Sequence, residues 1–220
     1  EVDTNAPELA GASIIDKSPC TVTSSPFSKT HGTSMASLLV SKAYGVAPDA
    51  TLLTYTTSQP GDNDVSGRDC TSSNGNGIED PVSLINRAIS DGAQIISISS
   101  SNDESSDTTK WAIARANAQG VIIVSPMGND AKDETLDTYS KWSGVVGVSA
   151  IDTTGKVASY SSWGQGTTVA AVGGPVVVHN YESGNKGFTD GTSNSVPLVA
   201  GFLALAKQKW PNATSNQLLQ

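Results

Sequence analysis

The strongest constraint on the fold is an alternation of short apolar runs with segments of helical pattern. The runs are rich in Val and Ile, and their apolar residues follow one another directly, as in strands that are covered on both faces. Four of them are ASIID (12–16), ATLLTYT (50–56), AQIISIS (93–99) and GVIIVS (120–125). Strands of this kind are typical of parallel sheets.

The segments between these runs have the marks of helices. They are HGTSMASLLVSKAYG (31–45), DPVSLINRAISDG (80–92) and DTTKWAIARANAQG (107–120). The second and third begin with Asp, a good N-cap, and end with Gly, which suits a C-terminal cap. The order of strand, helix, strand and helix predicts an α/β fold: a three-layer, doubly wound, mostly parallel sheet flanked by helices.

The second half of the chain is richer in apolar runs than in helices. Those runs are VVGVSAI (145–151), VASYSSW (157–163), TTVAA (167–171) and PVVVH (175–179). A last helix is predicted over 192–208. A chain of 220 residues fits one α/β domain, so we expect a single domain over 1–220.

Charge argues against two classes of partner. The chain has 13 basic and 21 acidic residues, for a net charge of −8, and it contains no basic cluster. Such a chain does not attract phosphate backbones or anionic lipid, so we expect no nucleic-acid partner and no membrane-surface role. The longest apolar run, 195–206, falls short of the roughly 20 residues that a membrane span needs.

Composition points to a secreted protein. Only 15% of the residues are charged, and small polar residues are abundant. The chain has two cysteines, Cys20 and Cys70, both in polar stretches. In an extracellular setting this even count favours a disulfide, with two free thiols as the alternative.

Several polar residues are expected at one edge of the sheet. Asp16 ends the first apolar run, His31 opens the first helical segment, Asn129 follows the run at 120–125, and Ser193 opens the last helix. In open α/β sheets, ligands bind at the carboxyl ends of the strands. We therefore expect these four regions to converge on one site.

These regions also contain longer motifs. They are HGTSMA (31–36) followed by GVAPDA (45–50), IISISSS (95–101), VIIVSPMGN (121–129) and GTSNSVPLVAG (191–201). In sequence and in order they resemble the signature blocks of the subtilases, the subtilisin-like serine proteases. The resemblance extends over nearly the whole chain and includes the stretch at 145–164.

The resemblance implies which serine is the nucleophile. The GTS of the family's nucleophile block is followed shortly by a Pro, as Ser193 is by Pro197, whereas the similar stretch around Ser34 lacks one. Ser193 is therefore expected to be the nucleophile. His31 is expected to be the base, because the other histidine, His179, has no Gly-Thr beside it.

The remaining roles follow from the same blocks. Asp16 is expected to orient His31, although IIDKSP and its short spacing to His31 depart from the family pattern. Its rival, Asp3, lies in a polar stretch with no strand before it. The side chain of Asn129 and the backbone N–H of Ser193 are expected to form the oxyanion hole. Ser99, Ser100 and Ser101 are expected to lie beside the substrate, where the family has Ser-Leu-Gly.

These residue types suit the hydrolysis of peptide bonds. A serine hydroxyl is a weak nucleophile at neutral pH and needs a neighbouring base, and a histidine can accept its proton and pass it to the leaving amine. An aspartate orients the imidazole and stabilises its charged form. We expect a serine endopeptidase that acts on protein or peptide substrates. The alternatives are a catalytically inactive subtilase-fold module for binding or assembly, and an unrelated α/β ligand-binding protein.

No cofactor or metal is expected for catalysis. The stretch DNDVSG (62–67) resembles the start of a calcium-binding loop, but Ser73 stands where such a loop needs a bidentate Glu. A solvated acidic loop is the preferred interpretation, and calcium binding is the alternative. The chain stops at Gln220, in or just after a helix that the family continues, so we expect a C-terminal truncation.

Overall fold

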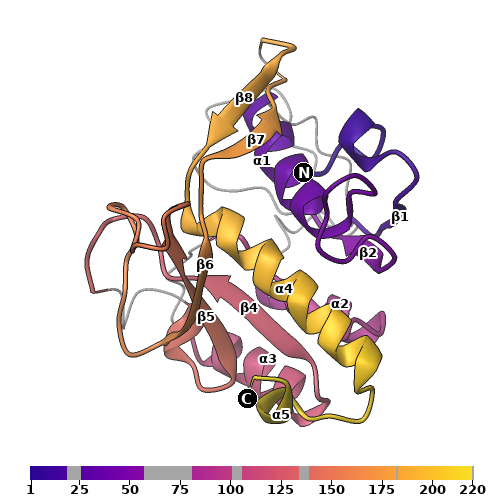
Figure 1. The fold of residues 1–220 in the computed structure, drawn as a ribbon. Coiled ribbons are helices and arrows are strands. Elements are labelled where there is room, and N and C mark those ends of the chain that lie inside the picture. Colours follow the sequence, from indigo (N-terminus) through magenta and orange to yellow (C-terminus); the bar gives the residue numbers. More distant parts are fainter. Residues whose placement is uncertain (19–25, 57–80, 101–105, 134–138, 182, 220) are drawn as a thin grey trace.

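The computed structural model describes residues 1–18, 26–56, 81–100, 106–133, 139–181 and 183–219, and they form an α/β fold (Figure 1). Its helices are η1 (Pro7–Leu9), α1 (Pro26–Val40), α2 (Pro81–Ser90), α3 (Asp107–Ala118), η2 (Tyr139–Lys141), α4 (Thr192–Lys209) and α5 (Ser215–Leu218). Its strands are β1 (Ser13–Asp16), β2 (Thr51–Thr54), β3 (Ile95–Ser97), β4 (Ile122–Pro126), β5 (Val145–Ile151), β6 (Thr167–Val172), β7 (Val176–His179) and β8 (Lys186–Thr189).

Parallel pairing dominates the sheets. Strands β3, β4, β5 and β6 form one parallel ladder in that order, with Ile123 opposite Ile96 and Val124 opposite Val146. Strands β1 and β2 form a second parallel ladder, in which Asp16 lies opposite Thr54. With helices on both faces of the larger ladder, the predicted three-layer α/β fold is confirmed.

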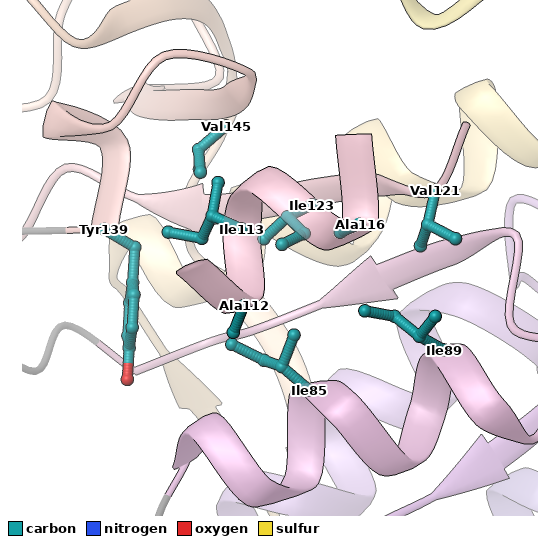
Figure 2. Packing of buried hydrophobic residues seen from close by; sticks show 9 residues of the cluster. All are labelled: Ile85, Ile89, Ala112, Ile113, Ala116, Val121, Ile123, Tyr139 and Val145. Carbon is teal, nitrogen blue, oxygen red and sulfur yellow. The ribbon is translucent and has the colours of Figure 1, made fainter. Parts of the chain in front are cut away.

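One face of the larger ladder is covered by α2 and α3. Apolar side chains of the two helices, of β4 with the residue before it, of η2 and of β5 make one buried cluster: Ile85, Ile89, Ala112, Ile113, Ala116, Val121, Ile123, Tyr139 and Val145. Figure 2 shows Ile85 and Ile89 of α2 directed toward the strand and the neighbouring α3. This packing explains the apolar i, i+4 spacing of α2.

The opposite face is covered by α4. Figure 1 shows this helix lying across the sheet, and its side chains Val196, Ala200 and Leu203 share a buried cluster with Ile122 and Val124 of β4. Successive residues of β4 thus point to different helix layers, and all are buried. Each such Val or Ile contributes about 1.5–3 kcal/mol on burial, which explains why the run is apolar without interruption.

The N-terminal elements pack around α1. Ala6 and Leu9 of the first segment form a small core with Ala36 and Val40 of α1. Helix α1 also packs against α4. This packing places the helix that carries His31 against the helix that carries Ser193. Next to it, Gly201 of α4 approaches the segment that follows α1, where a Cβ would lie 2.6 Å from Cβ of Val46.

Two local predictions are wrong, and one predicted strand forms with a partner that the sequence did not predict. No strand forms at 157–163, where only isolated bridges occur, and the hydroxyl of Ser161 accepts the N–H of Ala150 at 2.8 Å instead. The predicted strand at 175–179 pairs antiparallel with β8, which the sequence did not predict, since Lys186 and Gly187 interrupt its apolar pattern. Helix α1 begins at Pro26, so His31 lies in its second turn and does not open it.

None of the helices among the described residues is long and apolar enough to cross a bilayer.

Candidate active site

Ser193 is the second residue of α4. At this position a backbone N–H has no partner within the helix and lies at the positive end of the helix dipole. The residue is half-buried, so its hydroxyl is accessible. The turn before it is closed by a hydrogen bond from the N–H of Asn194 to the carbonyl of Gly191, at 3.1 Å. The local backbone thus presents an N–H and a hydroxyl at one helix end.

Pro197 explains how Ser193 is connected to Ser99. A proline inside a helix supplies no N–H to the carbonyl four residues earlier, which here is that of Ser193. The hydroxyl of Ser99 donates to this carbonyl at 3.1 Å. In return the hydroxyl of Ser193 donates to the carbonyl of Ser99 at 3.0 Å. The two predicted site residues are therefore joined by reciprocal hydrogen bonds.

Asn129 lies in the turn after β4, at the carboxyl edge of the sheet. Its Oδ1 accepts two hydrogen bonds from Thr192, one from the backbone N–H at 2.8 Å and one from the hydroxyl at 2.9 Å. These bonds orient the amide, because only its oxygen can accept. Nδ2 remains available as a donor, and a Cβ on Gly191 would lie 3.5 Å from it.

Asn194 and Ser195 stand where the family usually has Met and Ala. Asn194 is only 1% exposed, and its Nδ2 donates to the carbonyl of Gly173 at 2.9 Å. The hydroxyl of Ser195, also buried, donates to the carbonyl of Ala171 at 2.9 Å. Both polar residues thus anchor the first turn of α4 to β6 and the segment after it.

Asp16 occupies the carboxyl end of β1, as predicted. Its Oδ1 accepts hydrogen bonds from the N–H of Ser18 at 2.9 Å, from the hydroxyl of Ser18 at 2.5 Å, and from the hydroxyl of Thr54 at 3.1 Å. Partial burial raises the pKa of Asp16, but these hydrogen bonds outweigh it and lower the pKa below the ordinary value. The carboxylate is therefore ionised at neutral pH, and Oδ2 is not used by the bonds to Ser18 and Thr54.

His31 lies on α1 and keeps an exposed face. Although the residue is solvent-accessible, desolvation by the atoms around its ring lowers the pKa of His31 below its ordinary value. The atoms around the ring remove part of its hydration, which disfavours the charged form. The imidazole is consequently neutral at pH 7, the form that a general base requires.

The two halves of the predicted site are connected to different degrees. Ser193, Asn129 and Ser99 are linked by hydrogen bonds to one another or through Thr192. Among the described residues no hydrogen bond joins His31 to either Asp16 or Ser193. Ser100 follows β3 and is partly buried, whereas Ser101 falls outside the described part of the chain.

The rival residues have other partners. The hydroxyl of Ser34 is buried and donates to the carbonyl of Thr30 at 2.6 Å, within α1. Asp3 accepts the N–H of Asn5 at 3.0 Å and lies in no strand. His179 ends β7, where its Nδ1 is 3.6 Å from Oε1 of Glu8. None of these pairings connects a rival residue to Ser193.

Thr192 is a site residue that the sequence did not predict as such. It stands inside the GTS motif, and its position beside Ser193 is the signal that could have indicated its role. Two other predictions cannot be compared with the structure, since Cys20, Cys70 and the stretch 62–67 lie outside the described residues. Within the described ranges, no group of three or more His, Cys, Asp or Glu side chains could hold a metal ion.

Comparisons with known proteins identify the family of the chain. The sequence profile of the Subtilase family matches residues 6–220. A thermostable alkaline protease of Halalkalibacterium halodurans is 35% identical over 134 residues, which are 60% of this chain and 36% of that protein. Subtilisin DY of Bacillus licheniformis is 32% identical over 140 residues, and the match covers 62% of this chain and 51% of the relative. The chain thus spans about a third to a half of these two relatives.

A longer alignment and two solved structures cover most of the chain. Subtilisin BL of Lederbergia lenta is 29% identical over 213 residues, or 94% of this chain and 72% of the relative. A point mutant of the protease domain of PatA superposes with a TM-score of 0.79 at 23% identity, over 98% of this chain and 80% of that one. A cold-adapted subtilisin-like serine proteinase gives a TM-score of 0.77 at 21% identity, over 99% of this chain and 76% of that one. At these identities the two structures show a shared fold.

Proposed function

The chain belongs to the subtilase family, and from this premise we propose that it is a serine endopeptidase. The observation that carries the proposal is the pair of hydrogen bonds from Thr192 to Oδ1 of Asn129. They fix the amide by its oxygen. Its nitrogen and the N–H of Ser193, which has no partner within the helix, both lie near one point beside Gly191, since a Cβ on that glycine would be 3.5 Å from Asn129 Nδ2 and 3.8 Å from the nitrogen of Ser193. Two donors at one point are what a tetrahedral intermediate of acyl transfer needs.

In the proposed reaction, Ser193 Oγ attacks the carbonyl carbon of a peptide bond while His31 accepts the hydroxyl proton. The oxyanion is stabilised by the amide of Asn129 and the N–H of Ser193. His31 then protonates the leaving amine, and the peptide bond breaks to leave an acyl group on Ser193. Water, activated by His31, releases the acyl group. Asp16 holds the imidazole and stabilises its charged form.

The hydroxyl of Ser193 has to change partner before this reaction. In the described conformation it donates to the carbonyl of Ser99, so its proton is not directed to His31. Rotation of Ser193 about its Cα–Cβ bond would move the hydroxyl proton from the carbonyl of Ser99 to the imidazole of His31. A substrate strand beside Ser99, Ser100 and Ser101 competes for the same carbonyl and so favours this rotation.

Protein or peptide chains are the proposed substrates, and the relatives reported above carry names of proteases. No cofactor takes part in the proposed reaction. Calcium binding at 62–67 remains the alternative offered by the sequence, because this stretch lies outside the described residues. Secretion is proposed from the composition.

The alternative is an inactive subtilase-fold module for binding or assembly. It is favoured by one observation: within the described part of the chain, no hydrogen bond couples His31 to Asp16 or Ser193. In such a module Ser193 would keep its partner Ser99, and peptides would bind without being cleaved.

Labelling with a fluorophosphonate probe distinguishes the two functions, since the probe reacts with activated serines. We expect one label per chain, mapped by peptide mass spectrometry to Ser193, together with hydrolysis of a generic protein substrate. Ser193→Ala should lose both, whereas the matched variant Ser34→Ala should keep both. An unlabelled, folded wild-type protein that binds peptides without cleaving them would establish the alternative.

A further inference from the structure

The segment from Tyr160 to Ser162 contacts the loop that carries Asn129. The N–H of Ser162 donates to the carbonyl of Gly128 at 3.0 Å, and its Oγ accepts the N–H of Asp130 at 3.1 Å. The carbonyl of Tyr160 accepts the N–H of Ala131 at 3.0 Å. Residues on both sides of Asn129 are therefore fixed by this one segment.

The bond to Ala131 holds the backbone of that residue in a strained conformation. Ala131 has φ = 52°, and it is the only non-glycine residue of the described chain with positive φ. An alanine in this left-handed region is strained and persists only where its surroundings impose it. The hydrogen bond to Tyr160 is one of the interactions that impose it two residues after Asn129.

The side chain of the same tyrosine reaches the turn that carries Ser193. The hydroxyl of Tyr160 accepts the N–H of Gly191 at 3.1 Å, and this N–H also donates to the carbonyl of Gly173 at 2.9 Å. The hydroxyl is closely confined, since a Cβ on Gly173 would lie 2.6 Å from it. Burial, assisted by the charge of Asp190, raises the pKa of Tyr160, so the phenol stays neutral.

We infer that Tyr160 is a positioning residue, which sets the spacing of the two oxyanion donors by holding the Asn129 loop through its carbonyl and the Ser193 turn through its hydroxyl. The inference rests on the proposed function. Asn129 and Ser193 come from segments that are far apart in the sequence, one after β4 and one at the start of α4 (Figure 1). Donors in an oxyanion hole must converge at about 2.7–3.1 Å from one oxygen, so a small displacement of either loop weakens both bonds.

Loss of the hydroxyl should displace the turn without unfolding it. In Tyr160→Phe the N–H of Gly191 keeps its bond to Gly173, and the backbone carbonyl of residue 160 keeps its bond to Ala131. We therefore expect kcat to fall about 3- to 10-fold, less than the loss known for removal of an entire oxyanion donor. KM should stay within about twofold, because the hydroxyl has no part in binding the peptide chain.

Tyr55→Phe is the matched control. The hydroxyl of Tyr55 also makes one hydrogen bond, at 2.7 Å to Oδ2 of Asp91, away from Asn129 and Ser193. Each variant removes one phenolic oxygen with one hydrogen bond. Tyr55→Phe should leave kcat and KM unchanged. If kcat falls only in Tyr160→Phe, the fall is caused by where the hydroxyl of Tyr160 lies and not by the loss of a phenolic hydroxyl as such.

The test is a double-mutant cycle between Tyr160→Phe and Asn129→Ala, measured on the full chain with a peptide substrate. If Tyr160 acts through the oxyanion pair, its effect on kcat should shrink to less than about twofold when Asn129 is already Ala. A structural role would give the same fold-loss in both backgrounds, and that result would overturn the inference, as would an unchanged kcat in Tyr160→Phe. A wild-type chain that neither hydrolyses peptides nor reacts with the fluorophosphonate would instead show that the proposed function has failed, and the inference with it.

Discussion

The proposed site has a nucleophile half around Ser193 and a base half around His31 and Asp16, and the two differ in how closely their residues are connected. In the nucleophile half, Ser193, Thr192, Asn129 and Ser99 are joined by direct hydrogen bonds, all between described residues. In the base half, Asp16 is hydrogen-bonded to its own neighbours, and His31 lies on another element, α1.

This difference follows from what supports each half. Ser193 and Asn129 extend from α4 and β4, which pack together in one buried cluster. Asp16 lies on β1, which pairs only with β2 among the described strands, and residues 19–25 between Asp16 and α1 are outside the described part of the chain. A packed scaffold fixes functional geometry better than loops do. Substitutions in each half therefore test whether the base half acts together with the nucleophile half.

The largest effect is expected at Asp16. Asp16→Asn keeps the shape and the hydrogen bonds from Ser18 and Thr54, but it removes the charge that stabilises the imidazolium. We expect kcat to fall by about 10⁴, the loss seen when this change is made in a Ser-His-Asp triad. Steady-state kinetics with circular dichroism as a folding check measure it. Asp3→Asn is the control, and a folded Asp16→Asn protein with near-native kcat beside an inactive Asp3→Asn would move the triad to Asp3.

The next effect is expected at Asn129. Asn129→Ala removes one oxyanion donor, and kcat should fall by about 10²–10³ with little change in KM; this magnitude was measured in a subtilisin, so it carries over from a relative. Steady-state kinetics on a generic peptide measure kcat and KM of the wild type and of Asn129→Ala. A raised KM with unchanged kcat would show that Asn129 binds substrate and does not stabilise the oxyanion.

A smaller effect is expected at Ser99. Ser99→Ala leaves the carbonyl of Ser193 without the donor that replaces the missing N–H of Pro197. The free energy of unfolding should fall by about 1 kcal/mol, as for the loss of one hydrogen bond, and urea denaturation measures it. Ser100→Ala is the control, for which we expect no loss. Equal stability of both variants would show that the bond between Ser99 and Ser193 contributes nothing to the nucleophile half.

The smallest effect is expected in the pH profile. Desolvation lowers the pKa of His31, so the neutral base persists below the ordinary value of about 6.5. As the pH falls, kcat/KM should therefore decline with a midpoint below 6.5. The sign is fixed, because a group with a lowered pKa gains its proton only at lower pH. A midpoint above 6.5 would mean that the charge of Asp16 on the imidazolium outweighs desolvation, contrary to the expected direction.

Much of the fold and of the nucleophile half could be predicted from the sequence. The strands β1 to β4 are continuous apolar runs, and the resemblance of the local Gly-Asn and GTS…P motifs to those of the subtilases implied the roles of Asn129 and Ser193. The structure then explains Pro197, whose missing N–H leaves the Ser193 carbonyl to Ser99.

The rest depends on contacts between distant segments. The bond from Thr192 to Asn129 and the bonds of Tyr160 to two loops join residues far apart in the sequence, and no periodicity indicates them. The segment 157–163 has the composition of a strand, yet Ser161 and Ser162 use their hydroxyls on backbone N–H groups of β5 and of the Asn129 loop. The start of α1 at Pro26 could not be predicted from the HGT motif, because that motif lies in the second turn of the helix.

The central claim is that His31 activates Ser193, and the rate at which a fluorophosphonate labels Ser193 tests it most directly. The chain has only two histidines, so His31→Ala and His179→Ala form a matched pair. We expect His31→Ala to slow the labelling of Ser193 by at least about 10³-fold, since an unactivated serine hydroxyl is a weak nucleophile. His179→Ala should label at the wild-type rate. Equal labelling of Ser193 in wild type and His31→Ala would contradict the account.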